Sequence, residues 1–351
     1  MMSDRTMTNH TQTRTPRLNR REFLKISAVS VGLLAGTRLW GAARKNSVHT
    51  VKEARTLMGT VIHLSLVTAD ADQGQKVIDM TFAEIERLVG ILDHRKPQAA
   101  LARLNRDGAL HNAPVELTTV LDHALAYGAL SQGAFDVTVQ PLLLAYQNGG
   151  DLQAASSLVD YRLIRLNGDS ISLERRGMRL TLDGIAKGYI VDSGVALLQR
   201  SGFENVLVEA GGDLAGCGQR GDGAPWRVGI RHPRATDSTP YLSTLDISQQ
   251  AVATSGDYMN SFTRDFSQHH IVDPRQGVSP GSSPRELSSV TVIAPTAMDA
   301  DALSTTVMVL GVQEGRALLE RLPHVAGLLV SKTLDLWPTS NFPMLDRPVY
   351  V

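Results

Sequence analysis

Residues 181–189 read Thr181-Leu182-Asp183-Gly184-Ile185-Ala186-Lys187-Gly188-Tyr189. The spacing of apolar residues in and around this segment predicts a short strand over 179–182, a tight turn, and a helix over 185–200. Glycine in such a turn lets a ligand approach the backbone closely, and the N–H groups that begin a helix favour an anion. A phosphate group would fit there. From these residues alone, a plain tight turn with a solvated Lys187 remains the alternative.

Apolar periodicity on both sides of this segment predicts the other elements. Helices are expected over residues 75–92, 118–130, 298–310 and 314–322. Strands are expected over residues 61–67, 171–173, 205–209, 226–230, 242–247, 251–254, 289–294 and 326–331. Because helices and short strands are interspersed and no internal repeat is visible, the sequence predicts an α+β fold with a mixed sheet and a helical lobe.

The composition is that of a folded globular chain. The 351 residues include 42% hydrophobic and 20% charged side chains, which is the ordinary range. The formal net charge is zero, yet residues 1–45 carry nine Lys or Arg against two Asp or Glu. The rest of the chain holds 26 basic and 33 acidic residues, which argues against a nucleic-acid surface. The single cysteine, Cys217, excludes an internal disulfide.

The basic N-terminal segment resembles a twin-arginine export signal. It holds Asn19-Arg20-Arg21-Glu22-Phe23-Leu24-Lys25, an apolar run over 26–35, and small residues at 41–43. The apolar run is well short of the ~20 residues of a membrane span. We therefore expect residues 1–43 to be a signal for export to the periplasm, and residues 44–351 to be one domain without a membrane span. An amphipathic N-terminal helix of the fold is the alternative.

Oxygen-bearing side chains gather near the start of the helix expected over 298–310. Asp301 and Thr305 are four residues apart, so they lie on one face of that helix. Carboxylate and hydroxyl oxygens suit Mg²⁺, which shares its remaining positions with waters and phosphates. Alternatively, Asp299 or Asp301 caps the helix by accepting hydrogen bonds from its first N–H groups.

Two further segments hold candidates for acid–base chemistry. His270 lies in the segment 269–274, beside an expected strand and turn, and histidine accepts a proton near neutral pH. It is a candidate general base, and a structural role is the alternative. Asp257, in the segment 253–258, is the second catalytic candidate. The chain has no Gly-x-Ser-x-Gly elbow that would support a serine hydrolase.

Eight short motifs, taken in order, resemble those of the FAD:protein FMN transferase family, also called ApbE. They are Met58-Gly59-Thr60, Ala102-Arg103-Leu104-Asn105, Gly133-Ala134-Phe135-Asp136, Gly184-Ile185-Ala186-Lys187-Gly188-Tyr189, Gly211-Gly212-Asp213, Ala251-Val252-Ala253-Thr254-Ser255-Gly256, His270-Ile271-Val272-Asp273-Pro274 and Asp301-Ala302-Leu303-Ser304-Thr305. Each motif is weak alone, but their common order over residues 51–330 argues against an accidental match.

The resemblance implies an ApbE-like, T-fold-related α+β domain that binds Mg²⁺ through Asp301, Thr305 and the backbone carbonyl of Gly184. It also implies contacts with FAD at Met58, Ala134, Phe135, Asp136, Asp183, Lys187 and the backbone around Ile271. The family's reaction moves FMN from FAD to a Ser or Thr hydroxyl of an acceptor protein and releases AMP. To break a pyrophosphate, an enzyme must neutralise the negative charge on its oxygens and align the incoming oxygen. A metal beside helix N-termini can do both.

The chain departs from the family pattern at two places. His94 stands where the family usually has a Tyr that stacks on the flavin. The family's common Asp-Leu-Gly-Gly reads Thr181-Leu182-Asp183-Gly184 here, so the acid appears two residues later. This form resembles the NosX branch, which accompanies nitrous oxide reductase. It implies a membrane-bound acceptor flavoprotein of the NosR, RnfG or NqrC type.

Two other functions would use the same residues. An exported, Mg²⁺-dependent FAD pyrophosphatase would let water replace the acceptor hydroxyl, and it would release FMN and AMP without an acceptor. A non-catalytic FAD-binding or delivery protein would bind FAD tightly and form no AMP, even with an acceptor present.

Overall fold

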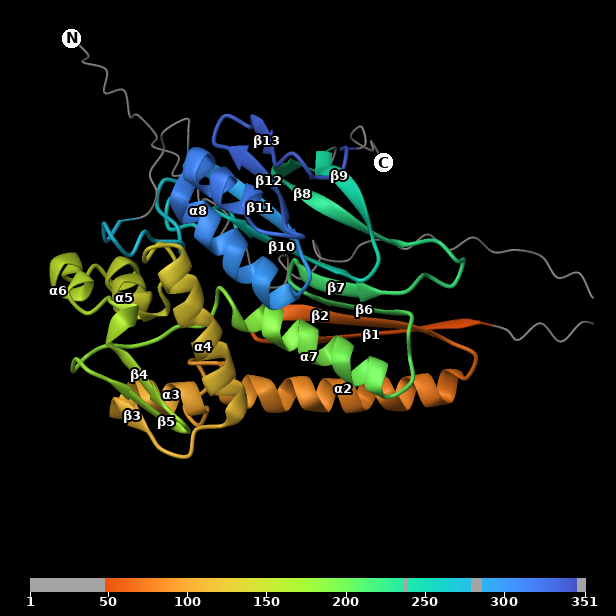
Figure 1. Ribbon diagram of the computed structural model, residues 1–351, viewed down its shortest axis with the longest axis horizontal. Coiled ribbons are helices and arrows are strands. Elements are labelled where there is room, and N and C mark those ends of the chain that lie inside the picture. The colour runs from red at the N-terminus through yellow and green to blue at the C-terminus, as the bar shows by residue number, and fades with distance from the viewer. Residues whose placement is uncertain (1–47, 237–238, 279–285, 346–351) are drawn as a thin grey trace, which may run out of the picture. The chain divides into compact units, whose positions relative to one another are not determined.

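The computed structural model describes residues 48–236, 239–278 and 286–345 (Figure 1). The expected signal over residues 1–43 lies outside these ranges. The helices are α2 (Ala71–Leu92), α3 (Ala100–Asp107), α4 (Val115–Leu130), η1 (Val137–Val139), α5 (Gln140–Asn148), α6 (Leu152–Ser156), η2 (Tyr161–Leu163), α7 (Ala186–Arg200) and α8 (Ala297–Glu320). The strands are β1 (His49–Leu57), β2 (Thr60–Thr68), β3 (Ala109–Leu110), β4 (Ile164–Asn167), β5 (Ser170–Leu173), β6 (Val206–Ala210), β7 (Asp213–Cys217), β8 (Trp226–Thr236), β9 (Thr239–Ile247), β10 (Gln250–Gly256), β11 (Leu287–Ala294), β12 (Ala326–Ser331) and β13 (Leu336–Pro338).

An eight-stranded sheet forms the centre of the domain, in the order β1-β2-β6-β7-β10-β11-β12-β13. Every ladder between its neighbouring strands is antiparallel. Successive side chains of a strand point to opposite faces, and in β11 Val292 packs in one hydrophobic cluster while Ile293 packs in another. The α+β expectation is confirmed, with an antiparallel central sheet.

Helices and a hairpin cover the two faces of this sheet. Helix α7 contacts β6 and β7, and α8 contacts β10 and β11, so both helices lie on one face (Figure 1). The hairpin of β8 and β9 contributes Trp226 and Leu245 to the cluster that contains Ile293, on the other face. This layering places α7 and α8 next to each other, where they contact directly.

The expected helical lobe gathers at one end of the domain. Figure 1 shows α3, α4, α5 and α6 there, together with the small sheet of order β3-β5-β4. Helix α4 also contacts α8, so the lobe reaches the helices that cover the central sheet.

The strand expected over 179–182 is wrong. The segment joins no sheet, and the side chain of Asn105 makes the backbone hydrogen bonds that a partner strand would make. Nδ2 of Asn105 donates to the carbonyl of Leu180 at 2.8 Å, and Oδ1 accepts from the N–H of Leu180 at 2.6 Å. The N–H of Thr181 donates to the carbonyl of Val137 at 2.8 Å. A side chain from α3 therefore holds the turn that precedes α7.

The two helices expected over 298–310 and 314–322 are merged in α8. A break remains at Gly311, whose φ of 75° and ψ of −174° are not helical. Glycine adopts this positive φ without strain, which explains why the apolar pattern is interrupted there. Across the described part of the chain, no helix combines the length and the apolar character needed to cross a bilayer.

Candidate active site

Helices α7 and α8 cross in close contact at Gly188. A Cβ atom at Gly188 would lie only 2.2 Å from the carbonyl oxygen of Ala297, in the first turn of α8. The two backbones therefore leave no room for a side chain. The crossing brings the start of α7 beside residues 297–305, and both segments contain predicted site residues.

We expect Gly188→Ala to lower the free energy of unfolding by roughly 1–3 kcal/mol, because backbone atoms must move to admit the methyl group. Gly194→Ala on the same helix is the matched control. A Cβ atom there would make ordinary contacts, 3.5 Å from Val208 and 3.6 Å from Thr81. The control should be neutral or stabilising by up to about 1 kcal/mol, since Ala favours helix over Gly. Chemical denaturation measures both variants, and equal stabilities would contradict the close crossing.

Lys187 joins two buried carboxylates at this crossing. Its ammonium group is ion-paired with Asp213 at the start of β7, and it lies 3.3 Å from Oδ1 of Asp301 on α8. Oδ2 of Asp301 accepts a hydrogen bond from the N–H of Gly188 at 3.1 Å. Both carboxylates are only 2% exposed. We call these three side chains the Lys187 cluster; it carries a net negative charge when both acids are ionised.

The pKa values of the Lys187 cluster reflect this imbalance. Burial, together with the charge of Asp213, raises the pKa of Asp301 to about 7 despite the nearby Lys187. Burial also raises the pKa of Asp213. Burial alone would lower the pKa of Lys187, but the two carboxylates raise it above its ordinary value. The lysine therefore stays charged, and an additional cation would favour the ionised form of Asp301.

Thr305 lies one helical turn after Asp301 on α8, and it is next to Gly184, which precedes α7. A Cβ atom at Gly184 would lie 3.0 Å from Oγ1 of Thr305 and 3.4 Å from the ring of Phe135. Oγ1 of Thr305 is also 3.2 Å from Oγ of Ser255 on β10. Gly184, Ser255 and Thr305 are half-buried whereas Asp301 is buried, so the site is partly open with a carboxylate at its base.

Asp301, Thr305 and Gly184 together suit a hard cation such as Mg²⁺. They offer one carboxylate, one hydroxyl and one backbone carbonyl, and the negative Lys187 cluster favours a positive charge. Over residues 48–236, 239–278 and 286–345, no three His, Cys, Asp or Glu side chains converge as metal ligands. A set with a single carboxylate matches a cation that takes its other ligands from water and phosphate.

The start of α8 assigns different roles to its two acids. Oγ1 of Thr296, the N-cap residue, accepts from the N–H of Asp299 at 3.1 Å and donates to Oδ2 of Asp299 at 2.6 Å. Oδ1 of Asp299 accepts a hydrogen bond from the hydroxyl of Tyr127 at 2.6 Å. Asp299 is thus part of the helix cap. The carboxylate of Asp301 is bound to α7 instead. Neither acid accepts a hydrogen bond from the first N–H groups of α8, so the capping alternative is wrong for both, and Thr296 is the N-cap residue.

His270 lies on the loop between β10 and β11. Its Nδ1 atom is buried and has no hydrogen-bond partner among the described residues. Burial lowers the pKa of the imidazole below its ordinary 6.5, and the charges of Asp183 and Lys187 act on it in opposite directions. The lowered pKa favours the neutral form of the ring at pH 7. These properties are those of a general base.

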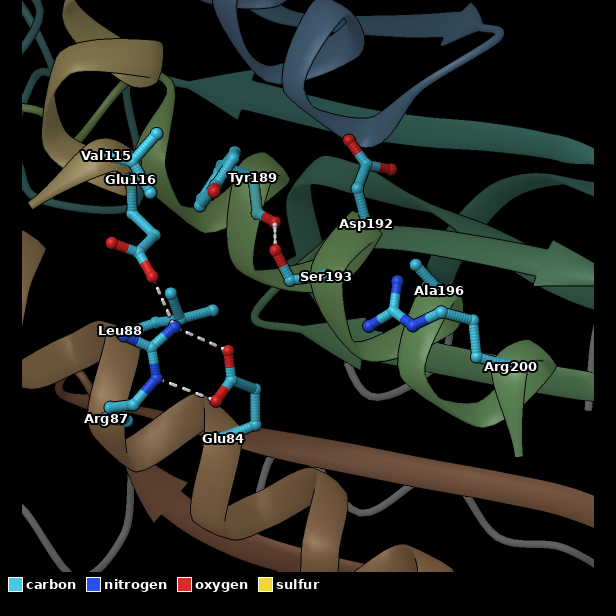
Figure 2. A pocket seen from close by; sticks show the side chains of 10 residues that line it. All are labelled: Glu84, Arg87, Leu88, Val115, Glu116, Tyr189, Asp192, Ser193, Ala196 and Arg200. Carbon is cyan, nitrogen blue, oxygen red and sulfur yellow. Dashed lines mark hydrogen bonds and ion pairs between the residues drawn. The ribbon is translucent and has the colours of Figure 1, made fainter.

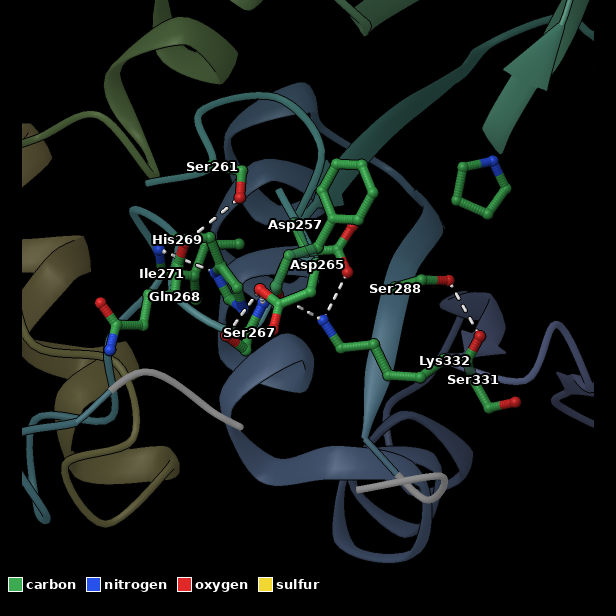
Figure 3. Close-up of polar contacts among 12 residues, drawn as sticks. Asp257, Ser261, Asp265, Ser267, Gln268, His269, Ile271, Ser288, Ser331 and Lys332 are labelled. Atoms are coloured by element: carbon green, nitrogen blue, oxygen red, sulfur yellow. Dashed lines mark hydrogen bonds and ion pairs between the residues drawn. The ribbon is translucent and has the colours of Figure 1, made fainter. Parts of the chain in front are cut away.

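Asp257 is fully buried at the start of the same loop (Figure 3). Its oxygens accept two hydrogen bonds from Arg234, at 2.8 and 2.9 Å, and Nζ of Lys332 lies 2.5 Å from Oδ2. Lys332 also donates to the carbonyl of Phe266 at 2.9 Å. Asp257 thus ties the loop that carries His270 to the sheet. A direct catalytic role for Asp257 stays a prediction.

Met58 and Gly59 form the two-residue turn between β1 and β2. Their φ angles are +53° and +74°, as in a type I′ hairpin turn. A Cβ atom at Gly211, in the turn between β6 and β7, would lie 2.4 Å from Oγ1 of Thr60. The Met-Gly-Thr and Gly-Gly-Asp motifs are therefore neighbours, and the second motif leads directly to Asp213.

Ala134 and Asp136 lie in buried positions of the loop after α4. Ala134 belongs to the same hydrophobic cluster as Ile271, so two of the segments predicted to contact FAD share one part of the core. Both oxygens of Asp136 are occupied, since Oδ1 accepts from the N–H and Oγ1 of Thr138 and Oδ2 accepts from the N–H of Tyr161. The side chain of Asp136 therefore shapes the loop. Its contact with FAD stays a prediction.

Asp183 and His94 form a polar edge of the site. Asp183 is exposed in the turn before α7, and Arg95 lies 3.3 Å from its Oδ1. Burial lowers the pKa of His94, and the charge of Asp183 opposes this shift. The charge of Asp183, the acid that is displaced by two residues from the family pattern, raises the pKa of His94 and that of His270 against the effect of burial.

Asp213 and Ser255 had no expected role, yet both lie at the site. Each belongs to a motif that the sequence analysis quoted, over 211–213 and 251–256. The available signal was a polar residue in an otherwise apolar strand or directly after a glycine turn. What the sequence could not indicate was the partner, because Asp213 meets Lys187 across 26 residues and Ser255 meets Thr305 across 50.

Curated relatives resemble most of the chain. The FAD:protein FMN transferase of Vibrio cholerae is 31% identical over 296 residues, which cover 79% of this chain and 86% of that protein. The FAD:protein FMN transferase of Salmonella typhimurium is 30% identical over 289 residues, covering 77% and 81%.

Solved structures share the fold. The flavin transferase ApbE from Vibrio cholerae matches with a TM-score of 0.71 at 28% identity, over 84% of this chain and 98% of that one. The ApbE protein from Thermotoga maritima matches with a TM-score of 0.75 at 25% identity, over 85% and 100%. The sequence profile of the ApbE family matches residues 58–329 in one run, from the Met58 turn to β12. With motifs, fold and profile in agreement, this chain belongs to the ApbE family.

Proposed function

We propose that this protein is an FAD:protein FMN transferase that works in the periplasm. It moves FMN from FAD to a Ser or Thr hydroxyl of an acceptor protein, forms a phosphoester and releases AMP, with Mg²⁺ held by Asp301, Thr305 and the carbonyl of Gly184. The main support is the arrangement at the α7–α8 crossing, where Lys187 meets the buried Asp213 and Asp301. The relatives that carry this enzyme name are 30% and 31% identical.

The chain's own residues supply acid–base chemistry and alignment. When bound, Mg²⁺ neutralises charge on the diphosphate oxygens. At the start of α7, the N–H groups of Ala186 and Gly188 already donate to the carbonyl of Leu182 and to Asp301, so the helix favours the same anion through its dipole. His270 accepts the proton of the acceptor hydroxyl at Nδ1, which no described side chain occupies. The hydroxyl oxygen bonds to the phosphorus of the FMN portion, and the bond to AMP breaks with its electron pair on AMP.

The proposed location and acceptor rest on two sequence features. The twin-arginine pattern within residues 1–43 supports export to the periplasm. The Thr181-Leu182-Asp183-Gly184 form supports a membrane-bound acceptor flavoprotein of the NosR, RnfG or NqrC type. FAD is the second partner, and the acidic balance of residues 46–351 argues against nucleic acid as another.

Mass spectrometry of an acceptor domain, incubated with the purified protein, FAD and Mg²⁺, tests the proposal. The expected result is FMN bound covalently to the acceptor and one AMP formed for each FMN transferred. Rapid formation of free FMN and AMP without acceptor would instead indicate a pyrophosphatase. Bound FAD with no AMP, even with an acceptor present, would indicate a binding or delivery protein.

Stabilisation by Mg²⁺ should depend on pH around the pKa of Asp301. Folding raises this pKa from 3.8 to about 7. Without metal, the free energy of unfolding therefore falls as the pH rises toward 7, because the carboxyl ionises more readily in the unfolded chain. Below 7 a proton competes with the cation, and the affinity should fall roughly tenfold per pH unit. The rise of the thermal unfolding midpoint on adding MgCl₂ should therefore be larger at pH 8 than at pH 6. Asp301→Asn should abolish this difference, and equal shifts in the wild type would contradict the assignment.

A further inference from the structure

Three contacts join α8 to α7 and to the turn before α7. From one contact to the next, the residue number changes by four on each side. Gly184 meets Thr305, Gly188 meets Asp301, and Asp192 meets Ala297. Each step moves four residues forward along α7 and four back along α8, which is the register of two antiparallel helices in contact. We call these contacts the α7–α8 ladder. Its first two contacts involve the proposed metal ligands, and its third involves Asp192.

Asp192 binds the start of α8 with both carboxylate oxygens. Oδ1 accepts from the N–H of Ala297 at 2.8 Å, and Oδ2 accepts from the N–H of Met298 at 2.9 Å. Figure 2 shows the carboxylate pointing from α7 toward the neighbouring helix. A carboxylate at this end of α8 also complements the helix dipole. One side chain of α7 therefore holds two backbone groups of α8.

This contact is distinct from the ordinary cap of α8. The N-cap Thr296 and Asp299 satisfy each other within α8 itself. Asp192 adds a bond from a second helix, so it restricts where α8 lies relative to α7. Around it, a surface hollow of about 390 Å³ is lined by other charged side chains, of which Arg87 binds Glu84 and Glu116 (Figure 2).

We propose that Asp192 is a positioning residue of the flavin-transfer site. It fixes α8 along α7 so that Asp301 and Thr305 stand opposite Gly188 and Gly184. This inference rests on the proposed function, because the groups that it positions are the proposed Mg²⁺ ligands. The close crossing at Gly188 makes the register matter, since helices in such contact move as units.

Two variants separate positioning from capping. Asp192→Asn replaces one acceptor oxygen by a donor that faces an N–H group, so it should loosen α8. Asp192→Glu keeps the charge and both acceptor oxygens, but its side chain is one methylene longer. The glutamate can therefore bind the same N–H groups only if α8 moves relative to α7. Ser193→Ala is the matched control, because Oγ of Ser193 donates to the carbonyl of Tyr189 within its own helix.

The first readout is the rise of the thermal unfolding midpoint on titration with MgCl₂ or MnCl₂, and the second is the Mg²⁺ concentration for half-maximal flavin transfer. We expect both Asp192 variants to need roughly 10–100 times more metal in both measurements, the range typical of groups that orient metal ligands. Asp192→Glu should keep the metal-free midpoint near that of the wild type. Ser193→Ala should match the wild type throughout.

A wild-type metal response in Asp192→Glu would overturn the inference, even if Asp192→Asn fails to fold. The two proposals fail in different ways. Metal-dependent stabilisation of the wild type without transfer would refute the proposed function, and the midpoint shifts would still decide the role of Asp192. Transfer by a wild type that responds to neither metal would refute the positioning role and leave the transferase standing.

Discussion

Replacing Asp301 with Ala will reduce flavin transfer roughly a thousandfold or more, equivalent to about 4 kcal/mol of transition-state stabilisation. The substitution removes the only carboxylate of the proposed ligand set. It also removes one of the two acids of the Lys187 cluster, so Lys187 and Asp213 would pair with each other and the excess negative charge would vanish. The measurement is the initial rate of FMN attachment to an acceptor domain at saturating FAD and Mg²⁺.

Asp299→Ala provides the matched control, two residues away on the same helix. Asp299 takes part in the cap of α8 and in a bond to Tyr127, so its loss should cost about 1 kcal/mol of stability. Transfer by the folded control should stay near the wild-type rate. Full transfer by Asp301→Ala, or equal losses in the two variants, would refute the metal assignment.

Replacing His270 with Asn will lower turnover by roughly 10²–10⁴-fold, the usual contribution of a general base. The affinity for FAD should change little, because the role proposed for the buried Nδ1 atom is to accept a proton rather than to bind FAD. Single-turnover rates and FAD titration, followed by flavin fluorescence, separate the two effects. His111→Asn is the control, since His111 is exposed and its Nδ1 lies near Oγ of Ser170, at 3.2 Å.

The pH dependence adds an independent check on His270. Burial lowers its pKa below 6.5, so the neutral, proton-accepting form prevails above that value. At saturating Mg²⁺, the wild-type rate should rise with pH below 6.5 and level off above it, whereas the Asn variant should lose this acid limb. An unchanged rate, or an identical pH profile in the variant, would remove His270 from the mechanism.

Long elements with a regular apolar face could be predicted from the sequence. Helix α2 buries the apolar residues that were spaced for a helix over 75–92, and β12 matches its expected range of 326–331. Strand β1 was missed because it lies at the edge of the sheet, where its side chains are only half-buried and the apolar alternation is weak. The error over 179–182 had another cause, since Asn105 supplies the hydrogen bonds that a partner strand would have supplied.

The candidate site divides in a similar way. Asp301 and Thr305 could be placed on one helix face because their spacing is local. The sequence could not show that Thr296, rather than Asp299 or Asp301, is the N-cap residue of α8, because the carboxylate of Asp301 is directed to α7, which is distant in sequence. For Asp257, the sequence showed a carboxylate near a turn, but Arg234 reaches it from β8 and Lys332 from the turn after β12.

By itself, the sequence determined the α+β class, the order of the family motifs, and the four-residue spacings along 184–192 and 297–305, because each depends on neighbours along the chain. Only the tertiary structure decided that the residues along 184–192 face those along 297–305. It also decided that Lys187 binds two acids instead of being solvated, and that Asp192 binds the start of α8. The physical reason is that burial and charge pairing depend on which surfaces meet across the fold. In this protein, the absence of a side chain at Gly188 lets the two helices approach closely enough for their polar groups to bind.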